Sequence, residues 1–276
     1  MPRAKKQRTC IFCSRQGNIT KEHFWPAWLA HYFPKGGEDR YISELYAAEV
    51  KNPKRLKFRN ERQGKVITKK IRVVCSECNN GWMSALEEKV KPIIASFLIG
   101  HFHKLNKEQI TNLSFWVAVK AIVGEHAEDQ MALTPNNDRY LVWKSQIIPE
   151  YFNIFVGIHS SETKAAYVRH STTVSLTMEG LNPPLPLDIR RNLQTVSFLV
   201  GPLFFHVIAA RVAGFNIENV FNTKLLVKLW PMSLEEIDLF QLEKIDDVGL
   251  SNIVNQLDIL ISSPMAKYAG PLPENL

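Results

Sequence analysis

Four cysteines, arranged as two C-x2-C pairs, constrain the fold of this chain more than any other feature of its sequence. Cys10 and Cys13 form the first pair, and Cys75 and Cys78 form the second. Two residues between the members of a pair let both thiolates reach one ion, so the pattern indicates a structural zinc site with four cysteine ligands. Since 61 residues separate the pairs, a large insertion leaves the site and returns to it.

A redox role is the alternative for a C-x2-C motif. It explains the sequence less well, because there are two pairs and neither lies in a βαβ pattern. Disulfides are also disfavoured, because we expect a cytoplasmic protein in which thiols stay reduced. The basic N-terminus is not followed by an apolar signal core, and no stretch approaches the ~18 apolar residues of a membrane helix, so we expect no membrane partner.

Basic residues are concentrated in the same part of the chain as the cysteines. Residues 1–83 carry 18 basic and 7 acidic side chains, whereas residues 84–276 carry 16 basic and 20 acidic ones. A basic segment raises the local concentration of phosphate and releases counterions when it binds a polyanion. The charge asymmetry therefore favours a nucleic-acid partner for the first third, with a solvated basic arm as the alternative.

Length and composition indicate an ordinary globular protein. The 276 residues are 45% hydrophobic and 22% charged, which excludes disorder and fibrous repeats and suggests about two domains. We expect a zinc module over residues 1–100 and an α+β domain over residues 101–276. The latter is expected to position the module, to mediate oligomerisation, or to sense a regulatory partner.

An acidic residue and a histidine stand side by side in the basic segment, at Glu22 and His23, and Asn79 directly follows the last cysteine. An imidazole is well suited to take a proton from water near neutral pH. A carboxylate and a carboxamide can supply oxygen ligands to a hard divalent cation. These are the parts that a phosphodiester-cleaving site needs, although a lone Glu-His pair is also common surface chemistry.

The order of these motifs resembles a known family. C-x2-C, then Glu-His-x-x-Pro-x-x-Leu, then C-x2-C-Asn-Asn-x-Trp is similar to the zinc-containing HNH endonucleases, whose core is a ββα-metal finger of the treble-clef type. The resemblance covers residues 9–86, about a third of the chain. It implies an α+β fold class, with a treble-clef zinc module at the N-terminus that carries a basic hairpin insertion.

The resemblance also implies roles for individual residues. His23 would be the general base, while Glu22 and Asn79 would hold a catalytic Mg2+ or Mn2+ in an H-N-N variant of the site. Asn60 and Asn80 are the two candidates for the middle asparagine of the motif.

The insertion between the cysteine pairs interleaves basic and apolar residues. The segment 63–65 has the composition of a turn, so we expect a hairpin of residues 56–59 with residues 66–68. Its cations would contact phosphates without reading sequence, and a solvated hairpin face is the alternative. The candidate nucleic-acid-binding residues are Lys51, Lys54, Arg55, Lys57, Arg59, Arg62, Lys65, Lys69 and Lys70.

The remainder of the chain predicts helices and an antiparallel sheet. Apolar residues recur at helical spacing over 106–128, and a capping-box pattern at Ser233–Glu236 predicts a helix through Lys244. A final amphipathic helix is expected over 247–262. Five segments rich in β-branched and aromatic residues predict strands at 152–159, 166–176, 195–200, 203–212 and 224–229.

These observations lead to a ranked set of functions. The first is a metal-dependent HNH-type endonuclease that hydrolyses DNA, in phage defence or in a mobile element. The second is a non-catalytic zinc-containing protein that binds nucleic acid, and the third is a scaffold whose basic face meets an acidic protein. Phosphate contacts alone do not distinguish DNA from RNA.

Overall fold

The computed structural model of the protein describes residues 8–33, 40–49, 52–63, 66–127, 132–172, 192–211 and 223–256; of the strands at 40–49 and 52–63 it describes the backbone alone. Helices and strands are mixed along these ranges, and every paired strand is antiparallel to its neighbour. The expected α+β class with an antiparallel sheet is therefore confirmed.

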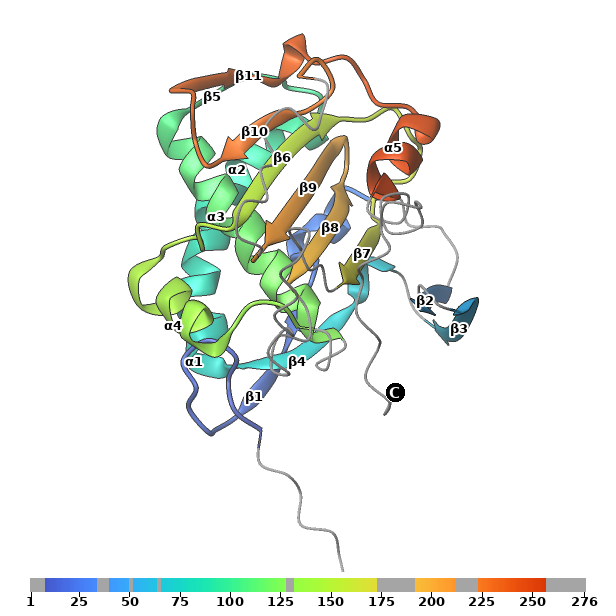
Figure 1. Ribbon diagram of the computed structural model, residues 1–276. Coiled ribbons are helices and arrows are strands. Elements are labelled where there is room, and N and C mark those ends of the chain that lie inside the picture. Colours follow the sequence, from blue (N-terminus) through green and yellow to red (C-terminus); the bar gives the residue numbers. More distant parts are fainter. Residues whose placement is uncertain are drawn as a thin grey trace, which may run out of the picture.

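A five-stranded sheet occupies the centre of the molecule, with strand order β10-β6-β9-β8-β7 (Figure 1). All five predicted strands are present in it, with ends that differ by a few residues from the predicted ones. Their bounds are β6 (Phe152–Ile158), β7 (Tyr167–Thr172), β8 (Leu193–Val200), β9 (Leu203–Ala210) and β10 (Val227–Trp230).

Helix α3 (Lys107–Glu125) lies against one face of this sheet (Figure 1). It is buried on every side over most of its length, as expected for an internal helix. The Trp116 ring packs edge-on against Phe198 and Phe205 at centroid distances of 6.1 and 6.0 Å. Because α3 is internal, each charged side chain along its buried length needs a partner inside the protein.

Three further helices surround this centre. Helix α2 (Ser84–Leu98) packs beside α3, and α4 (Asn136–Ser145) follows it in the chain. Helix α5 (Asp247–Val254) lies on the opposite face of the sheet, where its Ile253 joins a smaller hydrophobic cluster (Figure 1). The first eight residues of the helix expected over 247–262 are present as α5, which ends at Val254 with Asn255 as its C-cap; residues 257–262 lie outside the described residues.

The helix predicted from Ser233 to Lys244 is absent. That segment forms the short strand β11 (Glu236–Asp238) and the 3-10 turn η5 (Leu239–Gln241). Strand β11 pairs with β5 (Lys104–Asn106), and this pairing buries Ile237 opposite Leu105. Tertiary pairing therefore overrides a local capping pattern whose contribution is only about 1 kcal/mol.

The N-terminal region is built as strand, strand, helix. Strand β1 (Ile19–His23) pairs with β4 (Lys70–Cys75), which leads into a helical stretch that is kinked at Gly81. This stretch comprises α1 (Ser76–Cys78), a π-type turn η3 (Asn79–Met83) and then α2, and the connection between the strands includes the 3-10 turns η1 (Ala27–His31) and η2 (Val66–Thr68).

The insertion contains a hairpin, but its pairing differs from the expected one. Strand β3 (Asn52–Gln63) carries the basic run and pairs with β2 (Arg40–Glu49), which precedes it. Residues 66–68 form η2 instead of a strand. The physical reason is that β2 offers ten residues for pairing, more than three times the length of the predicted partner.

The two expected regions, 1–100 and 101–276, share one hydrophobic cluster. The indole Nε1 of Trp25 donates a hydrogen bond to the carbonyl of Leu199 at 3.0 Å, and Phe24 packs edge-on against Phe198. The end of β1 is therefore packed directly on the central sheet.

Candidate functional site

The two C-x2-C pairs come together as a cysteine cluster (Cys10, Cys13, Cys75 and Cys78). The first pair lies in a tight turn that a bridge between Thr9 and Gln16 closes. The second pair lies where β4 ends and the following helix begins.

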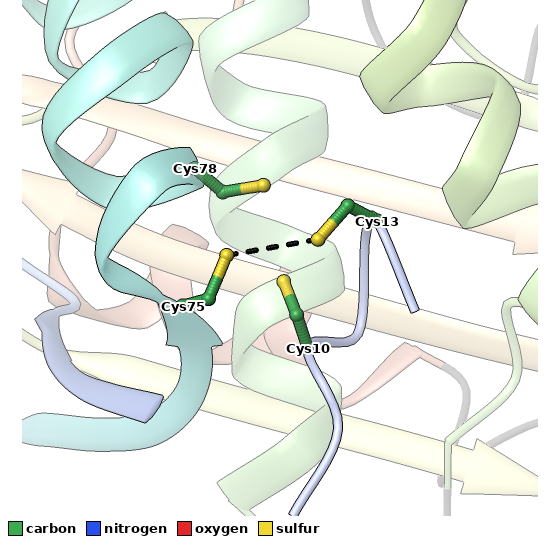
Figure 2. Close-up of side chains that lie close together, drawn as sticks. All are labelled: Cys10, Cys13, Cys75 and Cys78. Carbon is green, nitrogen blue, oxygen red and sulfur yellow. Dashed lines mark hydrogen bonds between the residues drawn. The ribbon is translucent and has the colours of Figure 1, made fainter. Parts of the chain in front are cut away.

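The sulfur atoms of the cysteine cluster converge on one point (Figure 2). All four side chains are buried, and their sulfurs lie within 4.8 Å of one another. The Sγ atoms of Cys13 and Cys75 are 3.6 Å apart. Four sulfurs at about 2.3 Å from a tetrahedral zinc ion are about 3.8 Å from each other, so the geometry suits zinc. The expected four-cysteine group that could hold zinc is confirmed.

The thiols of the cysteine cluster share protons through hydrogen bonds. The pKa of Cys10 is lowered to about 4 because the Cys78 thiol hydrogen-bonds its sulfur. Burial raises the pKa of Cys75 to about 12, and the shared proton together with burial raises that of Cys78 further. Cys75 and Cys78 therefore keep their protons at neutral pH unless a metal ion replaces them.

His23 lies at the end of β1, directly opposite Lys70 of β4. Lys21, Lys70 and Arg72 are all exposed, whereas Glu22 and Ile71 between them are buried. Since alternate residues of a strand point to opposite faces, these three cations lie on the same solvent side of the two strands as His23, and Lys70 is directly opposite it. We call Lys21, Lys70 and Arg72 the cationic face.

The environment of His23 favours its neutral form. Burial lowers its pKa below the ordinary value of 6.5, and the ammonium of Lys70 lowers it further. The carboxylate of Glu22 acts in the opposite direction but does not outweigh these effects. A half-buried, neutral imidazole beside Lys70 and on the same side as the cationic face is suited to accept a proton near a bound phosphate.

Glu22, the expected ligand of a catalytic cation, is buried on the other side of the strand. Its Oε1 accepts a hydrogen bond from Nζ of Lys120, 2.7 Å away in α3. The same Nζ donates to Oε1 of Glu87 at 2.9 Å and to the backbone oxygen of His23 at 3.0 Å. We call this set of contacts the Lys120 network.

Asn79 and Asn80 lie in the π-type turn that follows Cys78. The amide nitrogen of Asn79 donates to Oγ1 of Thr20 at 3.1 Å, which leaves its amide oxygen as the group available to a cation. Asn80 is exposed.

A catalytic Mg2+ or Mn2+ does not fit the residues expected to hold it. Glu22 is paired with an ammonium, and Asn79 alone offers one carboxamide oxygen, whereas hard cations take several oxygen ligands. Among the His, Cys, Asp and Glu side chains of the described residues, the cysteine cluster is the one group of three or more that could hold a metal ion. Glu22 is therefore not assigned as a ligand of a catalytic metal ion.

The expected nucleic-acid contacts divide into two sets. Lys70 lies on the cationic face, and the ammonium of Lys69 lies 5.3 Å from the ring centre of Tyr167. Lys51 and Lys65 lie outside the described residues, as do the side chains of Lys54, Arg55, Lys57, Arg59 and Arg62, whose backbone belongs to β3.

Sequence reasoning missed Lys120 and Glu87 as members of the site, and it missed Lys21 and Arg72 as neighbours of His23. Lys120 does carry a signal, because it is the one charged residue in the apolar run 115–123. A lysine in such a run is buried only when it is paired. Its partners cannot be identified from the run itself.

Comparison of the chain with protein-family models, with curated proteins and with solved structures finds no match. Within the described residues, no helix is both long enough and apolar enough to cross a membrane.

Proposed function

We propose that the protein is an endonuclease of the HNH type that hydrolyses DNA phosphodiester bonds. The observation that carries the proposal is the position of His23: a half-buried imidazole with a lowered pKa, directly opposite Lys70 and on the same side of the two strands as the cationic face. The strand, strand, helix order that connects His23 to the cysteine cluster supports the resemblance to a zinc-containing treble-clef module.

The reaction follows from these groups. His23 takes a proton from a water molecule, whose oxygen attacks phosphorus while the bond to the leaving oxygen breaks. The leaving oxygen takes a proton from solvent, and the products are a phosphate monoester and a free hydroxyl group. Lys21, Lys70 and Arg72 bind the non-bridging oxygens and stabilise the negative charge that develops in the transition state.

Zinc in the cysteine cluster has a structural part in this proposal. The ion joins the N-terminal turn to the end of β4 and the start of the helical stretch. It lies in a closed, four-sulfur site, which leaves no position for water or substrate.

Plasmid cleavage tests the proposal. Wild-type protein, His23→Ala and the control His31→Ala are compared on supercoiled plasmid with Mg2+, Mn2+, Ni2+ or EDTA, after zinc content has been matched. His31 is a suitable control because it is exposed and lies eight residues further along the chain. Loss of a general base lowers the rate by about 10²- to 10⁴-fold, so His23→Ala should be inactive and His31→Ala unchanged. Full cleavage by His23→Ala would refute the assignment.

A second candidate is a non-catalytic zinc-containing protein that binds nucleic acid. The observation in its favour is the Lys120 network, in which Glu22 is paired with an ammonium and is not available as a ligand to a metal ion. It predicts salt-sensitive binding to DNA with no cleavage by the wild type under any of the four conditions.

A further inference from the structure

Lys120 is the most deeply buried cation among the described residues, with 1% of its side chain exposed. It projects from the middle of α3, whereas its partners belong to β1 and α2. An ammonium has three N–H donors. The three acceptors of the Lys120 network are Glu22, Glu87 and the backbone oxygen of His23, so each donor has one partner.

Charge pairing keeps Lys120 ionised in this position. Burial alone acts to lower its pKa, but the carboxylates of Glu22 and Glu87 outweigh burial and raise it. The ammonium therefore pairs with the buried carboxylate of Glu22 and the partly buried carboxylate of Glu87. Buried ion pairs of this kind contribute little to stability compared with apolar packing, so their presence suggests a requirement for a particular geometry.

The network acts on both sides of one peptide segment. Glu22 and His23 are adjacent, so their side chains point to opposite faces of β1. Lys120 binds the side chain of Glu22 and also the backbone oxygen of His23, which fixes the end of the strand at two points. The imidazole of His23 is thereby directed to the cationic face.

From this geometry we propose that Lys120 is a positioning residue for His23, and that Glu22 serves as an anchor of this network instead of a ligand to a catalytic cation. The inference rests on the proposed function for the role of His23. It goes beyond the proposed function because it gives structural roles to Glu22 and to Lys120 of α3.

The first test compares Glu22→Gln with Glu22→Ala in the plasmid assay. Glutamine keeps an oxygen that accepts from Lys120, so Glu22→Gln should retain cleavage within threefold of wild type, whereas Glu22→Ala should lose at least tenfold. A ligand to a cation would behave differently: Glu22→Gln would lose at least tenfold and would need more Mn2+ for half-maximal cleavage. That result would overturn the inference.

The second test removes the ammonium. Because Lys120→Met leaves the carboxylates of Glu22 and Glu87 without their cation, the decisive variant is Lys120→Met combined with Glu22→Gln and Glu87→Gln, which has no charge in the network. Its kcat should fall at least tenfold while KM for DNA changes less than twofold, since the cationic face is intact. Lys107→Met is the control, because Lys107 is also on α3 and its ion pair with Glu235 is exposed. A folded, zinc-loaded triple variant with wild-type kcat would overturn the inference.

A third readout does not depend on cleavage. The amide of Phe24 donates to the carbonyl of Lys69 at 3.0 Å, directly beyond His23. In the triple variant, hydrogen exchange at this amide should accelerate at least tenfold. The amide of Ile11, which donates to Val73 beside the cysteine cluster, should be unchanged. If the wild type does not cleave DNA, the proposed function fails. Equal hydrogen exchange at the Phe24 amide in the wild type and the triple variant would show that Lys120 does not position this end of β1.

Discussion

The cysteine cluster and the His23 site flank the same pair of strands, β1 and β4, but are assembled differently. The cysteines need only two short turns and one strand pairing to meet, and all four ligands come from residues 10–78. His23 depends in addition on Lys120, which lies 97 residues further along the chain. The metal site is therefore complete within the N-terminal region, whereas His23 is held in place by a residue from the rest of the protein.

The largest expected effect is on the N-terminal region that contains the cysteine cluster. Cys75→Ser removes one zinc ligand, and binding of structural zinc contributes about 10–16 kcal/mol in small finger peptides, so the variant should lose zinc and the fold of the N-terminal region. Zinc content and thermal unfolding check this. Ser76→Ala, one residue away and outside the cluster, is the matched control. A stable, zinc-free Cys75→Ser protein would show that the module is held by packing alone.

The second largest effect concerns Lys120, the residue of α3 that contacts Glu22 and His23. Lys120→Met should destabilise the protein by about 3–5 kcal/mol, because removal of the ammonium leaves the buried carboxylate of Glu22 uncompensated. Chemical denaturation measures the free energy of unfolding. Lys107→Met, whose ion pair with Glu235 is exposed, should change it by less than about 1 kcal/mol. Equal effects of both variants would contradict a special role for the buried pair.

The pH dependence of cleavage tests the environment of His23. The base must be neutral, and burial together with Lys70 lowers its pKa, so activity should rise with pH through a value below 6.5 and then level off. Lys70→Met removes one lowering effect and should move this acid limb to higher pH. A pH–rate profile of kcat for both proteins is the measurement. An acid limb that moves to lower pH would contradict the arrangement.

The smallest effect concerns the cationic face. Single Gln substitutions of Lys21, Lys70 or Arg72 should weaken DNA binding a few-fold, and each should reduce the slope of log affinity against log salt by about 1, as expected for one lost phosphate contact. Fluorescence anisotropy over a range of salt concentrations measures both quantities. Lys224, an exposed lysine in the C-terminal region, provides the control substitution. An unchanged slope in all three variants would place the nucleic acid elsewhere.

Several elements were predictable because local signals determine them. The apolar repeat over 106–128 correctly predicted α3, and the five β-rich segments correctly predicted the central sheet. The helix expected at Ser233 failed because Ile237 is buried by pairing with β5, a segment 130 residues earlier. The hairpin partner of β3 was wrong for a related reason, since strand pairing depends on which segment offers the longer ladder.

The sequence by itself determined the cysteine cluster, because ligand spacing is a local property that survives any arrangement of the insertion. It also placed His23 in a basic segment beside Glu22. Only the tertiary structure decided which way these two side chains face and what they contact. Burial of Lys120 in an internal helix draws Glu22 inward, and the alternation of β1 then directs His23 outward to the cationic face. No local pattern could specify this, because the ammonium that pairs with Glu22 reaches it only after α3 has packed against the sheet and the N-terminal strands.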